Sequence, residues 1–239
     1  ILGGGCLDPT SEAELDIGNV RTTILGGGDM WWNLTEARYE IPKNEGVHSL
    51  FAGSLWIGGL DDQNNLKIAA MTYRQTGSDF YPGPLNADSN SPLFGSTSFD
   101  DCNDYNQHWV ISKNEVEAYV TYLECTNNPD CDTDVSFPNY VVPDVITNWP
   151  SSHYSFDGTN EYLAPFIDVD GDGIYNNSDY PAYDLDATGN CSSEDYLYGD
   201  QSIWWVFNDA GNFHGETGGT QIGLETVSYT HLRAHETRS

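Results

Sequence analysis

The fold class of this chain follows from one run of residues, Gln201–Asn208, whose sequence is QSIWWVFN. Apolar side chains occupy both alternating positions of this run from Ile203 to Phe207, so a strand formed here has both faces covered. The run therefore predicts a central strand of a sheet. The polar residues 209–212 then predict a turn, and residues 220–225 predict a partner strand that returns beside the first.

Shorter apolar patterns predict further strands, and a change of phase at Gly18 predicts a bulge in the first of them. A polar turn at residues 61–65 predicts a hairpin between its two flanking strands, the earlier of which has both faces covered. The predicted strands cover residues 14–25, 37–41, 48–59, 66–74 and 139–147. We therefore expect a mainly β chain, an antiparallel β-sandwich-like domain with one short helix and long loops.

The one predicted helix begins after Ser112. Ser112 and Glu115 have the spacing of a capping box, and Ile111 and Val116 have the spacing of a hydrophobic staple. An apolar stripe at helical spacing follows and predicts a packing face, formed by Val116, Tyr119, Val120 and Leu123.

Residues 168–179, with the sequence DVDGDGIYNNSD, have the pattern of a twelve-residue calcium loop. Carboxylates so close together repel one another unless a cation neutralises them, and oxygen ligands select calcium over zinc. Gly173 falls at position six, where such loops turn sharply. The sequence therefore predicts a calcium loop inserted in the β domain, and its ligands are Asp168, Asp170, Asp172, Ile174 (by its carbonyl oxygen), Asn176 and Asp179.

Two features separate this loop from a helix-loop-helix calcium sensor. Position twelve is Asp179 in place of the bidentate glutamate, and Pro165 and Pro181 on either side predict that neither flank is helical. The loop resembles those of dockerins and thrombospondin-type repeats, in which calcium holds an irregular segment in place. A solvated acidic turn is the alternative interpretation.

The charge balance excludes several partners. Eight lysines and arginines stand against 37 aspartates and glutamates, which gives a formal net charge of −29. Binding to nucleic acid or to an anionic membrane needs basic clusters, and this sequence has none. The longest wholly apolar run is far too short to cross a bilayer, so no membrane span is expected. An acidic chain of this kind suits calcium and an extracellular or outer cell-surface location.

Five cysteines stand at positions 6, 102, 125, 131 and 191, without the spacing of a zinc site. Disulfides formed in an oxidising compartment are the better interpretation, and Cys125 with Cys131 predicts a small closed loop. The odd count leaves one cysteine over, and the remaining connectivity stays open.

The sequence nominates no catalytic or cofactor-binding residue, and an enzymatic role is less favoured than a non-enzymatic one. His48 is assigned a surface or cap role. His214 with Glu216 nearby suggests a metal or acid-base pair, but two residues do not make a site, and a loop histidine is favoured.

Three segments are predicted along the chain. Residues 1–11 are rich in glycine and are expected to fray, and residues 12–226 form a single β-rich domain. Residues 227–239 resemble a translated sequencing-adapter tail. The resemblance implies that this stretch is not native, so His231 and His235 within it are not interpreted as metal ligands.

A set of motifs resembles the N-terminal region of large secreted proteins of Bacteroidetes-type bacteria, exported by the type IX system and carrying a C-terminal sorting domain. The motifs are residues 19–21 (NVR), 28–32 (GDMWW), 51–59 (FAGSLWIGG), 72–75 (TYRQ), 79–85 (DFYPGPL), 162–166 (YLAPF), 199–201 (GDQ) and 204–209 (WWVFND). The resemblance implies a cell-surface or released protein with further domains in its full-length chain. It implies no particular reaction.

Two functions follow as expectations. The first is a secreted, calcium-stabilised domain with a structural or adhesive role, whose partners are cell-surface glycans or other surface proteins. The second is a carbohydrate-binding or polysaccharide-degrading module, since aromatic rings stack on sugars and glycosidases use two carboxylates. Exposed, coplanar rings of Trp31, Trp32 or Trp149 beside a groove favour the second function, and a packed sheet without a pocket favours the first.

Overall fold

The computed structural model describes residues 5–73, 76–154, 160–182, 197 and 199–232, and the described chain is mainly β. Its strands are β1 (Glu12–Leu15), β2 (Arg21–Leu25), β3 (Asp29–Met30), β4 (Tyr39–Glu40), β5 (His48–Leu50), β6 (Gly53–Ser54), β7 (Trp56–Leu60), β8 (Leu66–Ala70), β9 (Tyr81–Pro82), β10 (Trp109–Ser112), β11 (Ser152–Tyr154), β12 (Asn160–Tyr162), β13 (Phe166–Ile167), β14 (Tyr180–Pro181), β15 (Gln201–Asn208) and β16 (Glu225–Leu232). Its helices are α1 (Phe99–Asp104), α2 (Lys113–Thr126), α3 (Thr133–Ser136) and α4 (Asp144–Thr147).

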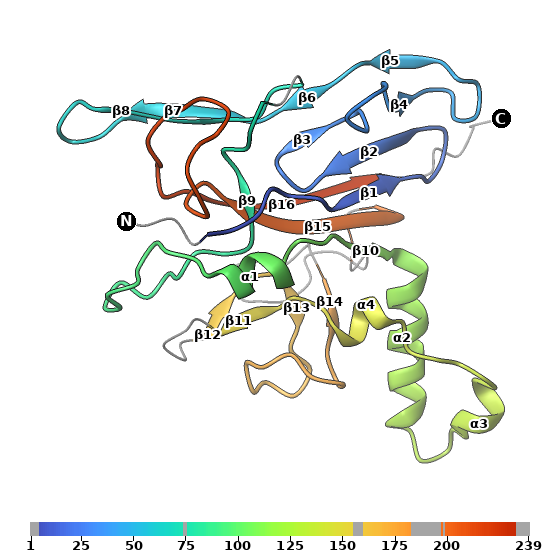
Figure 1. Cartoon of the computed structure of the whole chain (residues 1–239). Helices are drawn as coiled ribbons and strands as arrows, with labels where there is room; N and C mark the ends of the chain where they lie inside the picture. Colours follow the sequence, from blue (N-terminus) through green and yellow to red (C-terminus); the bar gives the residue numbers. More distant parts are fainter. Residues whose placement is uncertain (1–4, 74–75, 155–159, 183–196, 198, 233–239) are drawn as a thin grey trace.

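Two antiparallel sheets form the upper and middle layers of the molecule (Figure 1). The first has the order β5-β4-β2-β3-β6, with β1 paired to β2. The second has the order β10-β15-β16, with β9 also paired to β15. Three two-stranded pairs, β7–β8, β11–β12 and β13–β14, complete the sheet structure of the described residues.

Strand β15 is the central element, as its sequence predicts. It pairs with β10 along one edge and with β16 along the other. Ile203, Trp205 and Phe207 pack with Leu15 and Ile24 of the first sheet. The alternate side chains of β15, which include the fully buried ring of Trp204, point to the opposite side. The strand therefore serves two cores, one on each face.

The second core lies between β15 and a layer of helices and loops. Helix α2 begins at the predicted capping box, in which the Ser112 hydroxyl accepts from the Glu115 backbone N–H and the Glu115 carboxylate accepts from Ser112. Val116 and Tyr119 of its apolar stripe are buried against Trp109 and Trp204. This confirms the predicted helix, but the expectation of one short helix is wrong, because α1, α3 and α4 are also present.

Several predicted strands are interrupted. Gly18 has a φ of 71° and lies in a turn between β1 and β2, so the expected bulge is a hairpin turn. Residues 48–59 are divided among β5, β6 and β7. Within residues 139–147, α4 replaces the expected strand. The partner of β15 begins at Glu225, because the carboxylate of Asp209 holds the backbone of residues 222–224 in a loop.

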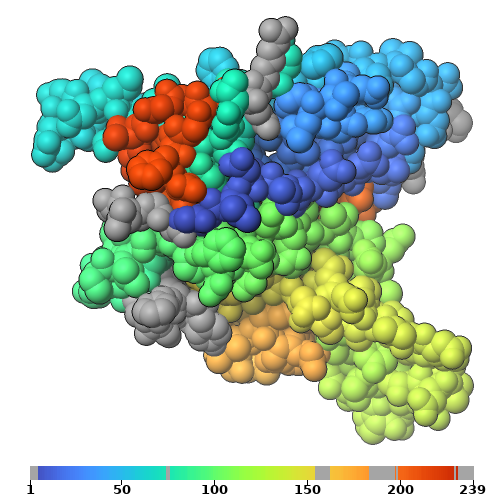
Figure 2. All heavy atoms as spheres, viewed as in Figure 1, coloured from blue at the N-terminus to red at the C-terminus, as the bar shows by residue number. Residues whose placement is uncertain are grey.

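The predicted β7–β8 hairpin is confirmed, but its faces are not both covered. It forms a separate two-stranded sheet that projects from the upper layer (Figure 1, Figure 2). Trp56, Leu60 and Leu66 share one of its faces, and their exposed fractions are 70%, 65% and 61%. The expectation that both faces of this strand are buried is therefore wrong.

Two disulfides cross-link the chain. Cys125 pairs with Cys131, as predicted, and Cys6 pairs with Cys102 across 96 residues. Cys6 is 1% exposed, so the expected fraying does not extend to this part of the N-terminal segment. Cys191 lies outside the described residues. No helix in the described part of the chain has the length and apolar character needed to cross a bilayer.

Candidate metal centre

The acidic loop, residues 168–179, connects the two strands of a short hairpin. Phe166 of β13 pairs with Pro181 of β14, and Ile167 pairs with Tyr180. Neither flank is helical, which confirms the prediction made from the two prolines. The loop lies below the middle layer, on the same side of it as α2 and α4 (Figure 1).

Two tyrosine hydroxyls fix the loop to the core. Tyr119 of α2 donates to the carbonyl oxygen of Asn177 at 2.6 Å, and Tyr175 donates to the carbonyl oxygen of Ile146 at 2.7 Å. Burial raises the pKa of both hydroxyls, so both remain protonated donors. The loop is thus attached to the packed helical layer at two points.

Three predicted ligands come together at the surface. Asp168, Asp170 and Asp172 each offer a carboxylate oxygen, and these three atoms lie within 4.8 Å of one another. Calcium binds oxygen at about 2.3–2.6 Å, so oxygens on opposite sides of one ion are about 5 Å apart. The spacing of the three oxygens therefore fits a shared divalent cation.

The backbone turns that gather these aspartates depend on two glycines. Gly171 and Gly173 both have a φ of 77°, a conformation that residues with a Cβ rarely adopt. Each donates its backbone N–H to one oxygen of Asp168 at 2.7 Å. The predicted sharp turn at Gly173 is present, and it leaves Asp170 and Asp172 exposed to solvent.

Asn176 presents its amide nitrogen to the predicted ligand oxygens. The nitrogen donates to Asp170 Oδ2 at 3.1 Å and to the Ile174 carbonyl oxygen at 3.2 Å. The bond from Asn176 to Asp170, followed by those from the Asp172 backbone and the Ser178 hydroxyl, lowers the pKa of Asp170. The amide oxygen accepts from Ser178. Ligation of an ion by Asn176 therefore requires the amide to rotate and exchange its two ends.

Asp179 is the last residue of the loop, and its side chain points into the interior. Its buried carboxylate accepts the backbone N–H groups of Val169 and Asn176, both at 2.8 Å. Burial raises the pKa of Asp179, and the negative charges of Asp170 and Asp168 raise it further. Asp179 is not a member of the surface triad, but it contributes a fourth negative charge beneath it.

The core residues to which the loop is attached, Tyr119 and Ile146, lie outside its sequence pattern. Tyr119 is predicted only as part of a packing stripe, and its bond to Asn177 joins residues 58 positions apart. No local spacing signals such a contact. The predicted surface role of His48 agrees with its exposure, whereas His214 is buried in a different part of the chain.

The chemistry of the site follows from its donor atoms. All of the gathered groups are oxygen donors, which favours hard divalent cations such as calcium over zinc or copper. Among the described residues, one group of acidic, histidine or cysteine side chains is close enough to share an ion. It consists of Asp168, Asp170 and Asp172. Comparison of the chain with protein-family models, curated proteins and solved structures finds no match to it.

Proposed function

We propose that this chain is a secreted or cell-surface domain of a larger multidomain bacterial protein, stabilised by calcium and structural or adhesive in role. The observation that carries the proposal is the convergence of Asp168, Asp170 and Asp172 within 4.8 Å, above the buried carboxylate of Asp179. Three negative charges at this spacing, with that of Asp179 close enough to interact with them, destabilise one another unless a cation neutralises them. A bound calcium ion removes that repulsion.

The attachment of the loop supports a structural role for the ion. Tyr119 and Tyr175 connect the loop to α2 and to Ile146, and both tyrosines pack with the core on the helical side of β15. An ion held by the loop therefore stabilises the β13–β14 hairpin in its place on this core. It does not connect two helices that could open on binding, so a sensor role is not proposed.

The proposed location rests on the cysteines and the charge. Cys6–Cys102 and Cys125–Cys131 are disulfides, which persist in oxidising compartments. The formal charge of −29 keeps such a domain soluble and suits a medium rich in calcium. The resemblance to type IX cargo proteins supports the same location and the presence of further domains in the full-length protein.

Calorimetric titration with calcium tests the proposal. Wild-type protein is expected to bind one equivalent, and Asp170→Asn and Asp172→Asn are expected to abolish binding while the exposed positions leave the fold intact. Asp62→Asn, which removes one exposed charge from the polar turn of the β7–β8 hairpin, is the matched control. Absence of calcium binding to the wild-type domain would refute the proposal.

Carbohydrate binding is the second candidate, and Trp56 is the residue that favours it. Trp32 and Trp149 are each 4% exposed, with their indole N–H groups bound to Asp29 and to the Pro165 carbonyl, so they offer no open ring face. Trp56 is 70% exposed, and its N–H donates to the Met71 carbonyl oxygen at 2.8 Å. A ring fixed in this way can stack on a sugar.

A glycan array distinguishes this second function from the first. Loss of a glycan signal in Trp56→Ala, with the signal retained in Leu66→Ala on the same face, would support sugar stacking. No glycan signal from the wild-type domain, with and without calcium, would eliminate it.

A further inference from the structure

A second group of charged side chains lies in the interior, apart from the acidic loop. The side chains of His214, Asp79 and Asp209 are all 0% exposed. The imidazole Nδ1 of His214 is 3.9 Å from Asp79 Oδ2, and its Nε2 is 3.6 Å from Asp209 Oδ2. Buried charges are costly unless each is paired and hydrogen-bonded, so this group must be balanced internally.

Both ring nitrogens of His214 face oxygen atoms that can only accept hydrogen bonds. Nδ1 is 2.7 Å from the carbonyl oxygen of Ile68, and Nε2 is 2.8 Å from the carbonyl oxygen of Asp209. A neutral imidazole carries one N–H, so its other nitrogen would place a lone pair against a carbonyl lone pair. Only the imidazolium, with two N–H groups, satisfies both contacts.

The carboxylates of Asp79 and Asp209 accept hydrogen bonds at both of their oxygens. Asp79 accepts the backbone N–H groups of Ala70, Glu216 and Thr217, and also the Thr217 hydroxyl. Asp209 accepts the backbone N–H groups of three successive residues, 222–224. Acceptance at both oxygens is the pattern of an ionised carboxylate. The cluster therefore holds one positive and two negative charges.

Two other charged groups lie near the cluster. Glu216 accepts from Thr72 and from the backbone of Thr76 and Gly77, and these bonds outweigh burial and lower its pKa. Lys67 lines a cavity of about 390 Å³ that also borders His214. Among the described residues, the carboxylates that pair with the imidazole are those of Asp79 and Asp209.

We propose that His214 is a doubly protonated imidazolium in the folded chain and that it acts as a proton-dependent latch for the loop of residues 209–224. The latch joins this loop to Ile68 and Ala70 of β8 through the contacts described above. Loss of one ring proton removes a donor, leaves both carboxylates without a counter-ion, and frees the loop at His214 and around Asp209, while Thr220 keeps its bonds to Leu66 and Ile68 of β8.

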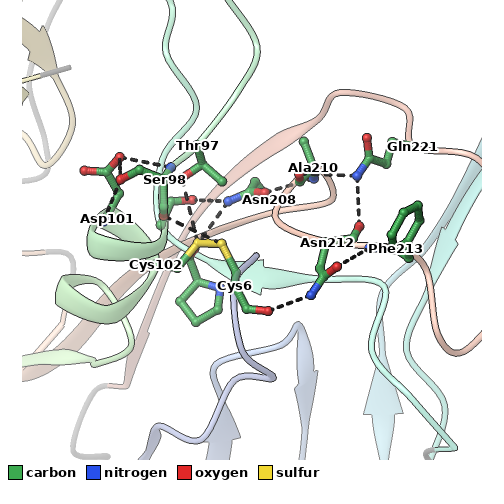
Figure 3. The surroundings of a disulfide bond; sticks show 12 residues. Cys6, Thr97, Ser98, Asp101, Cys102, Asn208, Ala210, Asn212, Phe213 and Gln221 are labelled. Atoms are coloured by element: carbon green, nitrogen blue, oxygen red, sulfur yellow. Dashed lines mark hydrogen bonds between the residues drawn. A yellow bond between two sulfur atoms is a disulfide. The ribbon is translucent and has the colours of Figure 1, made fainter. Parts of the chain in front are cut away.

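The same loop is held at its other side by the N-terminal disulfide. Asn212 donates to the Cys6 carbonyl oxygen at 2.9 Å, and Gln221 donates to the Asn212 carbonyl oxygen at 2.8 Å (Figure 3). The Cys6 N–H in turn donates to the Gly211 carbonyl oxygen. Opening at His214 is therefore local, because these contacts retain the loop near Cys6.

Nitrogen-15 NMR of the histidine rings in the wild-type protein tests the protonation state directly. At mildly alkaline pH, where an unperturbed imidazole is neutral, His214 is expected to show protons on both ring nitrogens. A neutral His214 tautomer under these conditions would overturn the proposal. This measurement needs no substitution, so it is independent of whether a variant folds.

Hydrogen exchange in His214→Gln tests the latch. Removal of one partner from a buried charge group is expected to speed exchange of the amides of residues 222–224 on the order of a hundredfold. His48→Gln is the matched control and is expected to leave these rates unchanged. Unchanged exchange in folded His214→Gln would show that the loop does not depend on the imidazolium.

Discussion

The hydroxyl of Tyr119, on helix α2, lies 2.6 Å from the carbonyl oxygen of Asn177 in the acidic loop and donates a hydrogen bond to it. Tyr119 is 3% exposed and belongs to the core that also contains Trp204 of the central strand. The position of the candidate metal centre is therefore coupled to the packing of the whole helical layer. Disturbing this one bond should affect both stability and calcium binding.

Tyr119→Phe should lower the free energy of unfolding by about 1 kcal/mol, because the carbonyl oxygen of Asn177 loses its donor while the ring still fills the core. Calcium affinity should fall as well, since the loop is less firmly held. Urea denaturation with and without calcium measures both effects. Tyr140→Phe is the control, because the buried Tyr140 hydroxyl has no hydrogen-bond partner within the described chain. Equal effects of the two substitutions would contradict this role of Tyr119.

Removal of calcium should lower the melting temperature of the wild-type domain. An ion that binds only the folded state stabilises it by about 2.7 kcal/mol at a hundred times its dissociation constant. Thermal unfolding in calcium and in excess EDTA measures the difference. Asp170→Asn should melt at the same temperature in both, because the exposed triad has lost a ligand. A wild-type melt that does not respond to EDTA would count against a stabilising ion.

The two disulfides should differ in their contribution to stability. Cys6 and Cys102 are 96 residues apart, whereas Cys125 and Cys131 are six apart. In the chain-entropy account, the first restricts the unfolded chain by about 4.7 kcal/mol and the second by about 2 kcal/mol. Urea denaturation of the paired serine variants should therefore show a larger loss for Cys6→Ser/Cys102→Ser. A larger loss for the other pair would exclude this account.

Elements with a strong local signal were predictable from the sequence. The run of apolar residues in β15 fixes its central place, and the capping box at Ser112 and Glu115 fixes the start of α2. The same holds for the β7–β8 hairpin and for the gathering of Asp168, Asp170 and Asp172. In each case the pattern is complete within a few neighbouring residues.

Elements that depend on distant contacts were not predictable in this way. Alternation in residues 48–59 predicts one strand with both faces buried. Burial of Trp56 would need a second layer packed over it, which the local pattern does not encode, and Trp56 is exposed. His214 has the local context of a loop histidine, and its buried contacts with Ile68 and Asp79 join it to parts of the chain more than a hundred residues away. Burial of a charge by a tertiary contact leaves no local periodicity.

His108 should make the domain less stable in acid. Its ring packs against Trp205, with centroids 5.3 Å apart, and neither ring nitrogen has a hydrogen-bond partner in the part of the chain that the structure describes. Burial lowers the pKa of His108 to about 4. The unfolded chain takes up this proton below about pH 6.5, whereas the folded chain does not until about pH 4. The stability of the folded state therefore falls as the pH falls through this window, by up to about 3 kcal/mol.

His108→Phe isolates this effect from the titration of the many carboxylates. The substitution keeps an aromatic ring against Trp205 and removes two buried nitrogens that have no partner among the described residues. The variant should lose less stability than the wild type between about pH 6.5 and pH 4, and the difference between the two curves should grow as the pH falls. Urea denaturation across this range provides both curves. Parallel curves would mean that the His108 ring gains its proton equally well in the folded and unfolded chains, and that its burial has no cost.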